Sequence, residues 1–527
     1  MKFFTFVEIL FRGSRISNAV LNALKKIGSA YKNSYLDRIF SKFGDNIKKK
    51  VFLSSSWNTF SGKDRLTVEW KDSIIYRITY RLLNTPALFA RKFYERHEGT
   101  FSGSYTFKVV KSLLRKFEIL TGLCLALIVI VPHDRWNNAY SSIIIFFLLL
   151  LYFVKTVVWK YMALELGTLD FMFFIFILSV VLAALLSVFP ALSIKYLLFY
   201  ISCFILLLIM TSSIKNGRNL ERLIEIFLVG ITITGLYGIW QRMAGVPFDP
   251  SFTDPELNEG MLGRVFSTMG NPNNYAEVLV MTLPFYLTAI FNSRTTVKKI
   301  VYGILAVPPL AALIFTGSRS GWVAFAFSLF IVMFFKNWKL IPFILAAGVL
   351  AFPLMPFFAP SVYRRILTIF NPNDSSANYR TLIWNAYMPM FKDFWTTGVG
   401  LGSLPFMRIL QRYELSALSN VTPPHTHNLF MEIWMEMGLA GIISFIWFTL
   451  RMFRISIYNI FSKSNTFLNN ILIAGLASVG GIFVMGFAEY VWFYNRTMLI
   501  FWTVIGIILA CLTISSNKDE LSKKAAG

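Results

Sequence analysis

From Phe117 onward, long apolar runs alternate with short polar segments along most of the chain. An α-helix needs about 20 apolar residues to cross the hydrocarbon core of a bilayer, and the runs approach this length. Helices are the expected form because each backbone N–H and C=O inside lipid must find its partner within the segment. The pattern predicts an all-α polytopic membrane protein with about twelve transmembrane helices. The predicted spans are 117–132, 139–155, 169–189, 194–213, 222–242, 275–292, 299–317, 320–336, 339–357, 428–450, 468–488 and 497–514.

The first 116 residues follow a different pattern and carry a net charge of +15, from 23 Lys or Arg and 8 Asp or Glu. Leu10, Ile16, Val20 and Leu24 recur at helical spacing among lysines and arginines. A basic amphipathic helix of this kind is typical of a segment that lies on an anionic membrane surface, and a head that docks a partner is the alternative. Residues 70–93 have a similar mixture and form a second candidate interfacial segment. The short opening apolar stretch predicts no signal peptide.

Composition and charge agree with a membrane protein and orient it. The chain of 527 residues is 56% hydrophobic and 15% charged, whereas soluble domains carry about 25% charged residues. With the basic extension in the cytoplasm, inside segments hold 39 Lys and Arg and outside segments hold 12, as the positive-inside rule requires. We therefore expect a multi-pass protein of the cytoplasmic (inner or plasma) membrane, with 1–116 and the tail 515–527 in the cytoplasm. The loops 243–274 and 358–427 are then external. The second is so long that we expect it to have a function beyond connecting two helices.

The external side is rich in arginine rather than lysine. Ten of its 12 basic residues are Arg, against 14 of 39 inside. Topology does not distinguish the two residues, but a guanidinium group matches phosphate or carboxylate oxygens in a bidentate manner. We interpret Arg242 and Arg496 as side chains that extend to the membrane boundary. The candidates for anion binding are Arg264, Arg319, Arg364, Arg365 and Arg380.

Two of the four histidines, His425 and His427, stand where the long loop re-enters the membrane. A histidine at this boundary is a candidate general base, and a structural role is the alternative. Thr426 or Asn428 is expected to cap the helix that follows. The sequence has no Asp-x-Asp pair, no Walker loop and no convincing metal-ligand set, and its three cysteines lie inside apolar runs. We therefore predict no metal and no cofactor.

Several stretches together resemble the O-antigen ligase and Wzy-type polymerase superfamily over roughly residues 117–514. The most specific is His427-Asn428 followed after nine residues by Gly438-Leu439-Ala440-Gly441, which is similar to the His-Asn-x9-Gly-x-x-Gly signature of that family. The resemblance does not extend to 1–116. The other matching stretches are Gly263-Arg264 with Gly270-Asn271-Pro272-Asn273-Asn274, Ser318-Arg319-Ser320-Gly321, Tyr379-Arg380 with Trp384, and Thr397-Gly398-Val399-Gly400-Leu401-Gly402.

This resemblance implies a metal-independent, inverting membrane glycosyltransferase of the GT-C kind. Such an enzyme transfers a glycan from undecaprenyl diphosphate to an acceptor hydroxyl on the outer side of the membrane, in cell-surface polysaccharide biosynthesis. By motif position, Arg264 and Arg319 would hold the diphosphate and His427 would be the catalytic base. Possible glycan-binding or supporting residues are Arg380, Asn271, Asn274, Asn428, Glu432 and His425, and either Glu432 or Glu436 could orient His427 or an arginine.

Two other classes remain as alternatives to this function. A polytopic transporter or flippase of lipid-linked glycans would also have about twelve spans, although the two halves of the chain show no convincing repeat. A peptidoglycan-type polymerase would use a loop carboxylate, for which Asp374 and Asp393 are available. Within the resembled superfamily, the sequence does not distinguish a ligase from a polymerase and does not identify the glycan or its lipid, protein or glycan acceptor. No nucleic-acid partner is expected, because the positive charge follows membrane topology.

Overall fold

The computed structural model describes residues 38, 70, 72–161, 164–166, 169–247, 263–370, 375–413, 422–462 and 465–526. The amphipathic helix predicted near residues 10–31 and the acidic candidate Asp374 lie outside this part of the chain. All regular secondary structure in the described part is helical, which confirms the predicted all-α polytopic class.

Every predicted span corresponds to an apolar helix, but in the described residues nine helices are long enough to cross a membrane. The count of twelve is therefore not established, since three of the predicted spans are shorter helices: α9 (Phe117–Ile130), α11 (Phe171–Leu185) and the segment formed by α17 (Ile341–Ala351), η5 (Phe352–Leu354) and α18 (Met355–Phe358). The nine longer helices are α10 (Asn138–Val158), α12 (Pro190–Ser213), α13 (Gly217–Ala244), α14 (Pro272–Asn292), α15 (Thr296–Phe315), α16 (Arg319–Asn337), α22 (Leu429–Ser462), α23 (Thr466–Gly486) and α24 (Asn495–Ala526).

Polar caps fix where several of these helices begin. Asn271 accepts hydrogen bonds from the backbone N–H groups of Asn273 and Asn274, and Pro272 occupies the first turn of α14, where its missing N–H costs nothing. Ser318 caps α16 in the same manner. Asn428 accepts from the N–H groups of Phe430 and Met431 at 3.0 Å, so the predicted cap of α22 is confirmed for Asn428.

Helix α15 continues through Pro308 and Pro309 rather than breaking there. The neighbouring helix α13 makes this possible by placing Gly235 against the two prolines. A Cβ at Gly235 would lie 2.5 Å from the backbone N of Pro309, so only glycine allows this approach. Small residues of this kind let membrane helices pack closely.

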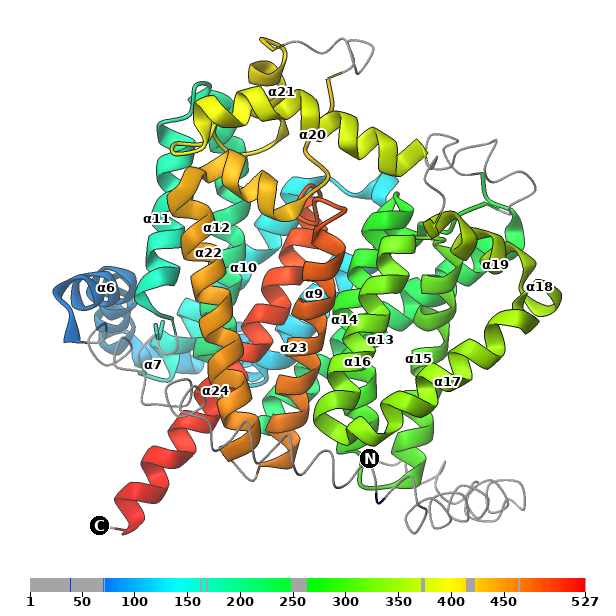
Figure 1. The fold of residues 1–527 in the computed structure, drawn as a ribbon. Coiled ribbons are helices and arrows are strands. Elements are labelled where there is room, and N and C mark those ends of the chain that lie inside the picture. Colours follow the sequence, from blue (N-terminus) through cyan, green and yellow to red (C-terminus); the bar gives the residue numbers. More distant parts are fainter. Residues whose placement is uncertain are drawn as a thin grey trace.

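After α17 and α18, which run along the side of the bundle, the long segment before α22 folds across one end of the bundle (Figure 1). It contains α19 (Pro360–Leu367), η6 (Thr368–Phe370), α20 (Ser375–Phe394) and α21 (Ser403–Leu410). These helices build a small apolar core of their own, in which Ile383, Tyr387 and Phe406 pack with Met435 of α22. The C-terminal end of α24 projects from the opposite end of the bundle.

This segment is attached to the bundle where α22 is interrupted. Gly438 has φ +69°, which interrupts the helix and frees backbone groups on either side. The N–H of Val399 donates to Met435 O at 2.7 Å, and the N–H of Leu439 donates to Thr396 O at 3.2 Å. A Cβ at position 438 would lie 2.2 Å from Thr396 O. The first glycine of the Gly-x-x-Gly pair is thus required both by its backbone conformation and by the close approach of the loop.

Candidate active site

The residues singled out in the segments predicted to be external gather at one end of the bundle. The beginnings of α14, α16 and α22 and the connection between α23 and α24 meet there, beneath α20 (Figure 1). The turn before α10 belongs to the same end, because a Cβ at Gly270 would lie 2.5 Å from the ring of His133. Arg496, interpreted above as a boundary residue, is buried and donates to Val131 O at 2.7 Å in this turn.

Two arginines hold the turn that leads into α16. The Nε of Arg264 donates to Thr316 O at 2.7 Å, and the Nε of Arg365 donates to Gly317 O at 3.0 Å. Gly317 has φ +60°, a conformation that favours glycine. Arg319 follows in this turn and donates through Nη1 to the backbone and side-chain oxygens of Thr368, at 3.0 and 3.1 Å. The Ser-Arg-Ser-Gly turn is therefore fixed between the α13–α14 connection and α19.

Arg264 is at the electrostatic centre of this end. Burial lowers its pKa, as do the charges of Arg365, Arg319 and Arg380, and with the opposing effect of Glu489 the pKa is about 9. Arg264 remains protonated at neutral pH, and three further guanidinium groups lie within electrostatic reach of it. A site with this excess of positive charge, partly out of water, suits a multiply charged anion.

Glu489 lies at the junction of these groups, and the sequence interpretation did not include it. Its Oε1 accepts from Arg380 Nη2 at 2.7 Å and from Asn273 Nδ2 at 3.0 Å. Asn273 in turn accepts from Arg264 Nη2 at 2.7 Å, which links the two arginines through one carboxylate. The signal was available, since Glu489 directly follows the predicted span 468–488 on the arginine-rich face.

His427 contacts the other oxygen of the same carboxylate. Its Nδ1 lies 3.5 Å from Glu489 Oε2. Burial opposes ionisation of Glu489, but His427, Arg380 and Arg264 outweigh it and hold the pKa of that carboxyl below its usual value. The side chain of His427 is 25% exposed, whereas Glu489 is buried. The ring can thus be oriented from the protein side through Nδ1 while it remains accessible from outside.

His425 supports the loop and is unsuited to carry a charge. Its Nδ1 accepts the backbone N–H of His427 at 3.1 Å, and the two ring centroids are 4.2 Å apart. Burial, His427 and Arg380 lower the pKa of His425 well below its usual value. His425 is therefore neutral at neutral pH. The backbone of His427 has φ +52°, a conformation that this local hydrogen bond stabilises.

The remaining predicted residues have structural partners. Glu432 accepts the N–H of Thr426 at 2.7 Å, and Glu436 accepts from Tyr200, Tyr490 and the N–H of Gly402. Glu489, rather than Glu432 or Glu436, is the carboxylate that lies against His427. Asn271 and Asn428 cap α14 and α22, and Asn274 is buried in the first turn of α14. Arg364 is exposed on α19.

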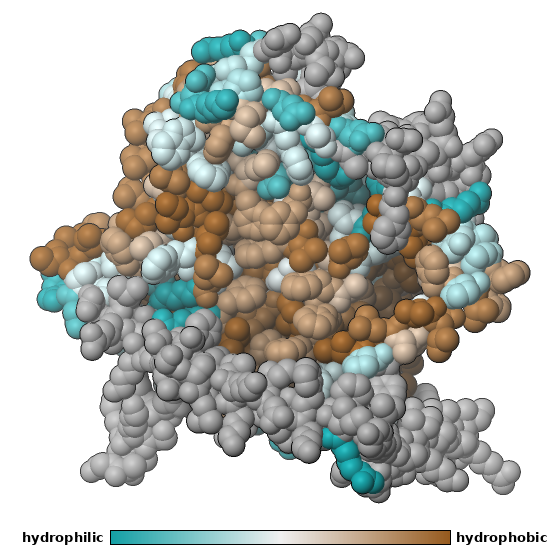
Figure 2. Space-filling view, in the orientation of Figure 1, coloured by the Kyte–Doolittle hydropathy of each residue, from teal (hydrophilic) through white to brown (hydrophobic). Residues whose placement is uncertain are grey.

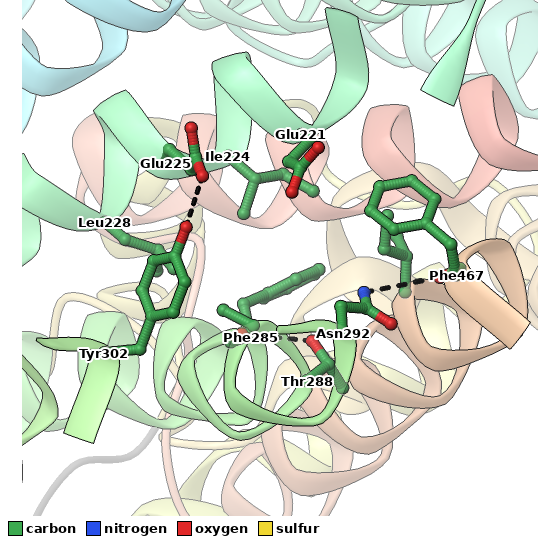
Figure 3. A pocket seen from close by; sticks show the side chains of 11 residues that line it. Glu221, Ile224, Glu225, Leu228, Phe285, Thr288, Asn292, Tyr302 and Phe467 are labelled. Atoms are coloured by element: carbon green, nitrogen blue, oxygen red, sulfur yellow. Dashed lines mark hydrogen bonds between the residues drawn. The ribbon is translucent and has the colours of Figure 1, made fainter. Parts of the chain in front are cut away.

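Pockets lie at both ends of the bundle in the described part of the chain. One, of about 300 Å³, is lined by Tyr490 and Phe493, whose rings also pack against His425. The other, of about 350 Å³, is lined by Glu221, Glu225 and Tyr302 and holds none of the predicted site residues (Figure 3). Across the described residues, no three His, Cys, Asp or Glu side chains are placed to hold a metal ion together.

Parts of the chain are similar to known proteins. The teichuronic acid biosynthesis protein TuaE of Bacillus subtilis (strain 168) is 23% identical over 248 residues, which are 44% of this chain and 49% of TuaE. The chain thus matches about half the length of this curated relative. Residues 304–446 match the O-antigen ligase (Wzy_C) family, and this range includes Arg319, Arg365, Arg380 and His427. This match confirms the resemblance seen in the sequence motifs over residues 304–446.

Proposed function

We propose that the protein is a membrane glycosyltransferase that moves a glycan from undecaprenyl diphosphate to an acceptor hydroxyl during cell-surface polysaccharide assembly. The family and the likeness to TuaE support a glycan ligase or polymerase of polysaccharide assembly. One observation supports the chemistry above all others: Glu489 joins His427 to Arg380 and, through Asn273, to Arg264. A candidate base and a candidate anion site thereby share one carboxylate.

The arginines bind the donor in this proposal. Arg264 and Arg319 contact the diphosphate, with Arg365 and Arg380 adding positive charge, while the polyprenyl chain remains in lipid. Negative charge grows on the diphosphate as its bond to the sugar lengthens, so fixed guanidinium groups stabilise the transition state more than the ground state. No divalent ion is needed for this stabilisation, since four cations are already in place.

His427 activates the acceptor. Its Nδ1 faces Glu489, so the proton of the neutral ring is on Nδ1 and Nε2 is free to accept. The acceptor hydroxyl oxygen attacks the anomeric carbon from the face opposite the diphosphate, and the hydroxyl proton passes to Nε2. The bond between the anomeric carbon and the diphosphate oxygen breaks with its electron pair on the diphosphate, which gives inversion. Glu489 then stabilises the imidazolium.

The large loop positions both substrates. Helices α20 and α21 lie over this end and are anchored to α22 at Gly438 and to the bundle through Arg380, whose Nε donates to Ala488 O at 2.8 Å. Orientation and exclusion of water are the contributions expected of such a cover. The proposed orientation places this end outside the cytoplasmic membrane and both termini in the cytoplasm.

The test is reconstitution of the purified protein in proteoliposomes with a lipid-linked glycan and candidate acceptors. We expect release of undecaprenyl diphosphate in step with glycan transfer, and little change after addition of a chelator. Movement of the intact lipid-linked glycan across the bilayer without cleavage would instead identify a flippase. Loss of turnover that a divalent ion restores would contradict donor binding by arginine alone.

A further inference from the structure

Helix α6 (Ile74–Arg96) of the N-terminal extension has two apolar sides, and one of them packs on the bundle. On that side Ala87 and Tyr94 are buried. Asn84 exchanges two hydrogen bonds with the backbone of Leu164, its Nδ2 donating to Leu164 O and its Oδ1 accepting from Leu164 N, both at 3.0 Å. The extension is thus fixed to the connection between α10 and α11.

The other side of α6 carries an outward apolar stripe. Its residues recur at intervals of four and seven, which places them on one side of a helix. Each is between 53% and 74% exposed, although each is a large aliphatic or aromatic side chain. Transfer of a side chain of this kind from water into an apolar phase is favourable. The stripe consists of Ile74, Ile78, Leu82, Phe89 and Phe93.

Helix α8 (Tyr105–Arg115) repeats this arrangement. Tyr105, Val109 and Leu113 recur every four residues and are 81%, 42% and 66% exposed. The short helix α7 (Glu98–Gly103) joins α6 to α8, and Tyr94 packs with Phe101 and Phe107 across the three helices. The outward stripes of α6 and α8 therefore belong to one folded unit, which we name the collar (residues 74–115).

Exposed cations accompany the outward stripe. They greatly outnumber the acidic residues of the same segment, Glu95 and Glu98. A polar face rich in Lys and Arg opposite large apolar side chains is typical of helices that lie in the headgroup layer of anionic membranes. The exposed cations of the collar and its immediate continuation are Arg77, Arg81, Lys92, Arg96, Lys108, Lys111, Arg115 and Lys116.

The position of the collar along the bundle axis also fits a membrane surface. Helix α10 runs from Asn138, beside the candidate active site, to Val158, which packs with Tyr94 of the collar. The collar therefore lies at the end of α10 away from the site, and Figure 1 shows α6 on the flank of the bundle, below the level of α20. Figure 2 shows hydrophobic residues over α6 that adjoin the hydrophobic side of the bundle, with hydrophilic residues beneath them.

We propose that the collar binds anionic phospholipid. The outward stripe enters the edge of the hydrocarbon layer in the leaflet opposite the candidate active site, and the surrounding cations bind phosphate-bearing headgroups. In the proposed orientation this is the cytoplasmic leaflet. Lipid binding by the collar is independent of the transfer reaction, because the collar contains no residue of the candidate active site and no part of the matched range 304–446.

Depth measurements test the position of the stripe. Leu82→Cys and Phe89→Cys variants, labelled with an environment-sensitive fluorophore, are reconstituted in vesicles of phosphatidylcholine and phosphatidylglycerol in equal proportion. Glu95→Cys is the matched control, since Glu95 is exposed on the same helix outside the stripe. We expect brominated acyl chains to quench the label at 82 and 89 and not at 95. Labels at 82 and 89 that are as hydrated as the label at 95 would overturn the proposal.

Lipid selectivity tests the role of the cations. Phosphatidylglycerol retained by the full-length protein is measured by native mass spectrometry for the wild type, Arg77→Gln and Arg81→Gln. We expect each substitution to weaken retention about fivefold and high salt to weaken it further. Equal retention of phosphatidylcholine and phosphatidylglycerol would overturn the anionic selectivity. A stripe that is hydrated in pure lipid vesicles and protected only in native membranes would identify a protein partner instead.

Discussion

The Nδ1 of His427 lies 3.5 Å from Oε2 of Glu489, and the two residues come from different connections of the bundle. The same carboxylate accepts from Arg380, so the candidate base is attached to the anion site through a single side chain. If Glu489 orients His427, replacement of Glu489 should change the pH dependence of glycan transfer. If its role is only structural, that pH dependence should stay the same.

Glu489→Gln keeps the size of the side chain and removes its charge. We expect the kcat for glycan transfer to fall about tenfold to hundredfold with little change in KM, the cost of a lost charged hydrogen bond. The pKa of Glu489 lies below its usual value, so its carboxylate is ionised at neutral pH. Its effect on His427 is lost as the pH falls through that lowered pKa. The acid limb of the pH–rate profile should change in the variant.

Asp393→Asn is the matched control for this substitution. Asp393 is exposed on α20, and its Oδ2 accepts from the hydroxyl of Tyr413 at 2.6 Å. Its kcat and pH profile should match the wild type. A Glu489→Gln variant with the wild-type profile would remove Glu489 from any role in orienting the base.

Arg264→Lys and Arg319→Lys test whether both residues hold one diphosphate. Lysine keeps the charge but loses the bidentate fork, so each variant should lose about 1.5–3 kcal/mol of transition-state binding. The double variant should depart from additivity, because groups that contact the same ligand couple. Turnover measured in proteoliposomes gives both quantities.

Arg242→Lys is the control, since Arg242 is interpreted as a boundary residue and not as part of the anion site. Arg242 donates to Gly263 O at 2.8 Å near the same end and has no assigned role in transfer. Its variant should retain activity. Strictly additive losses at positions 264 and 319 would show that the two arginines bind separate ligands. Unchanged turnover in both variants would show that their role is structural.

Gly438→Ala should weaken the attachment of the segment around Thr396 to α22. The substitution forces a left-handed backbone on alanine, at a cost of roughly 1–2 kcal/mol, and places a Cβ 2.2 Å from Thr396 O. We expect a lower Tm and reduced transfer. Gly303→Ala in α15 is the control, since a Cβ there meets no atom within 4 Å. Equal Tm values for the two variants would contradict this account of the break.

Cysteine labelling tests the orientation. A Lys392→Cys variant on α20 and a Ser102→Cys variant on α7 both place a thiol at an exposed position, at opposite ends of the bundle. In intact cells an impermeant maleimide should label position 392 and should reach position 102 only after permeabilisation. The reverse pattern would place the candidate active site on the cytoplasmic side.

The sequence predicted the helices because apolar length is a property of local segments, whereas the common site of Arg264, Arg319 and His427 was predicted from their positions in the motifs of the resembled family. Glu489 was missed because its importance depends on partners from three other parts of the chain, Asn273, Arg380 and His427. The break at Gly438 was missed for a related reason. The apolar pattern continues through it, and only the docked loop at Thr396 and Val399 shows why the helix opens there.

The most direct test of the central claim is the turnover of His427→Ala with a lipid-linked glycan donor in proteoliposomes. The substitution removes the proposed base while the caps and contacts of the loop, made by Thr426 and Asn428, remain. We predict that the variant inserts into the membrane and has the Tm of the wild type within a few degrees, and that it releases no undecaprenyl diphosphate above background. Near-wild-type release by this variant would contradict the assignment of His427 as the base.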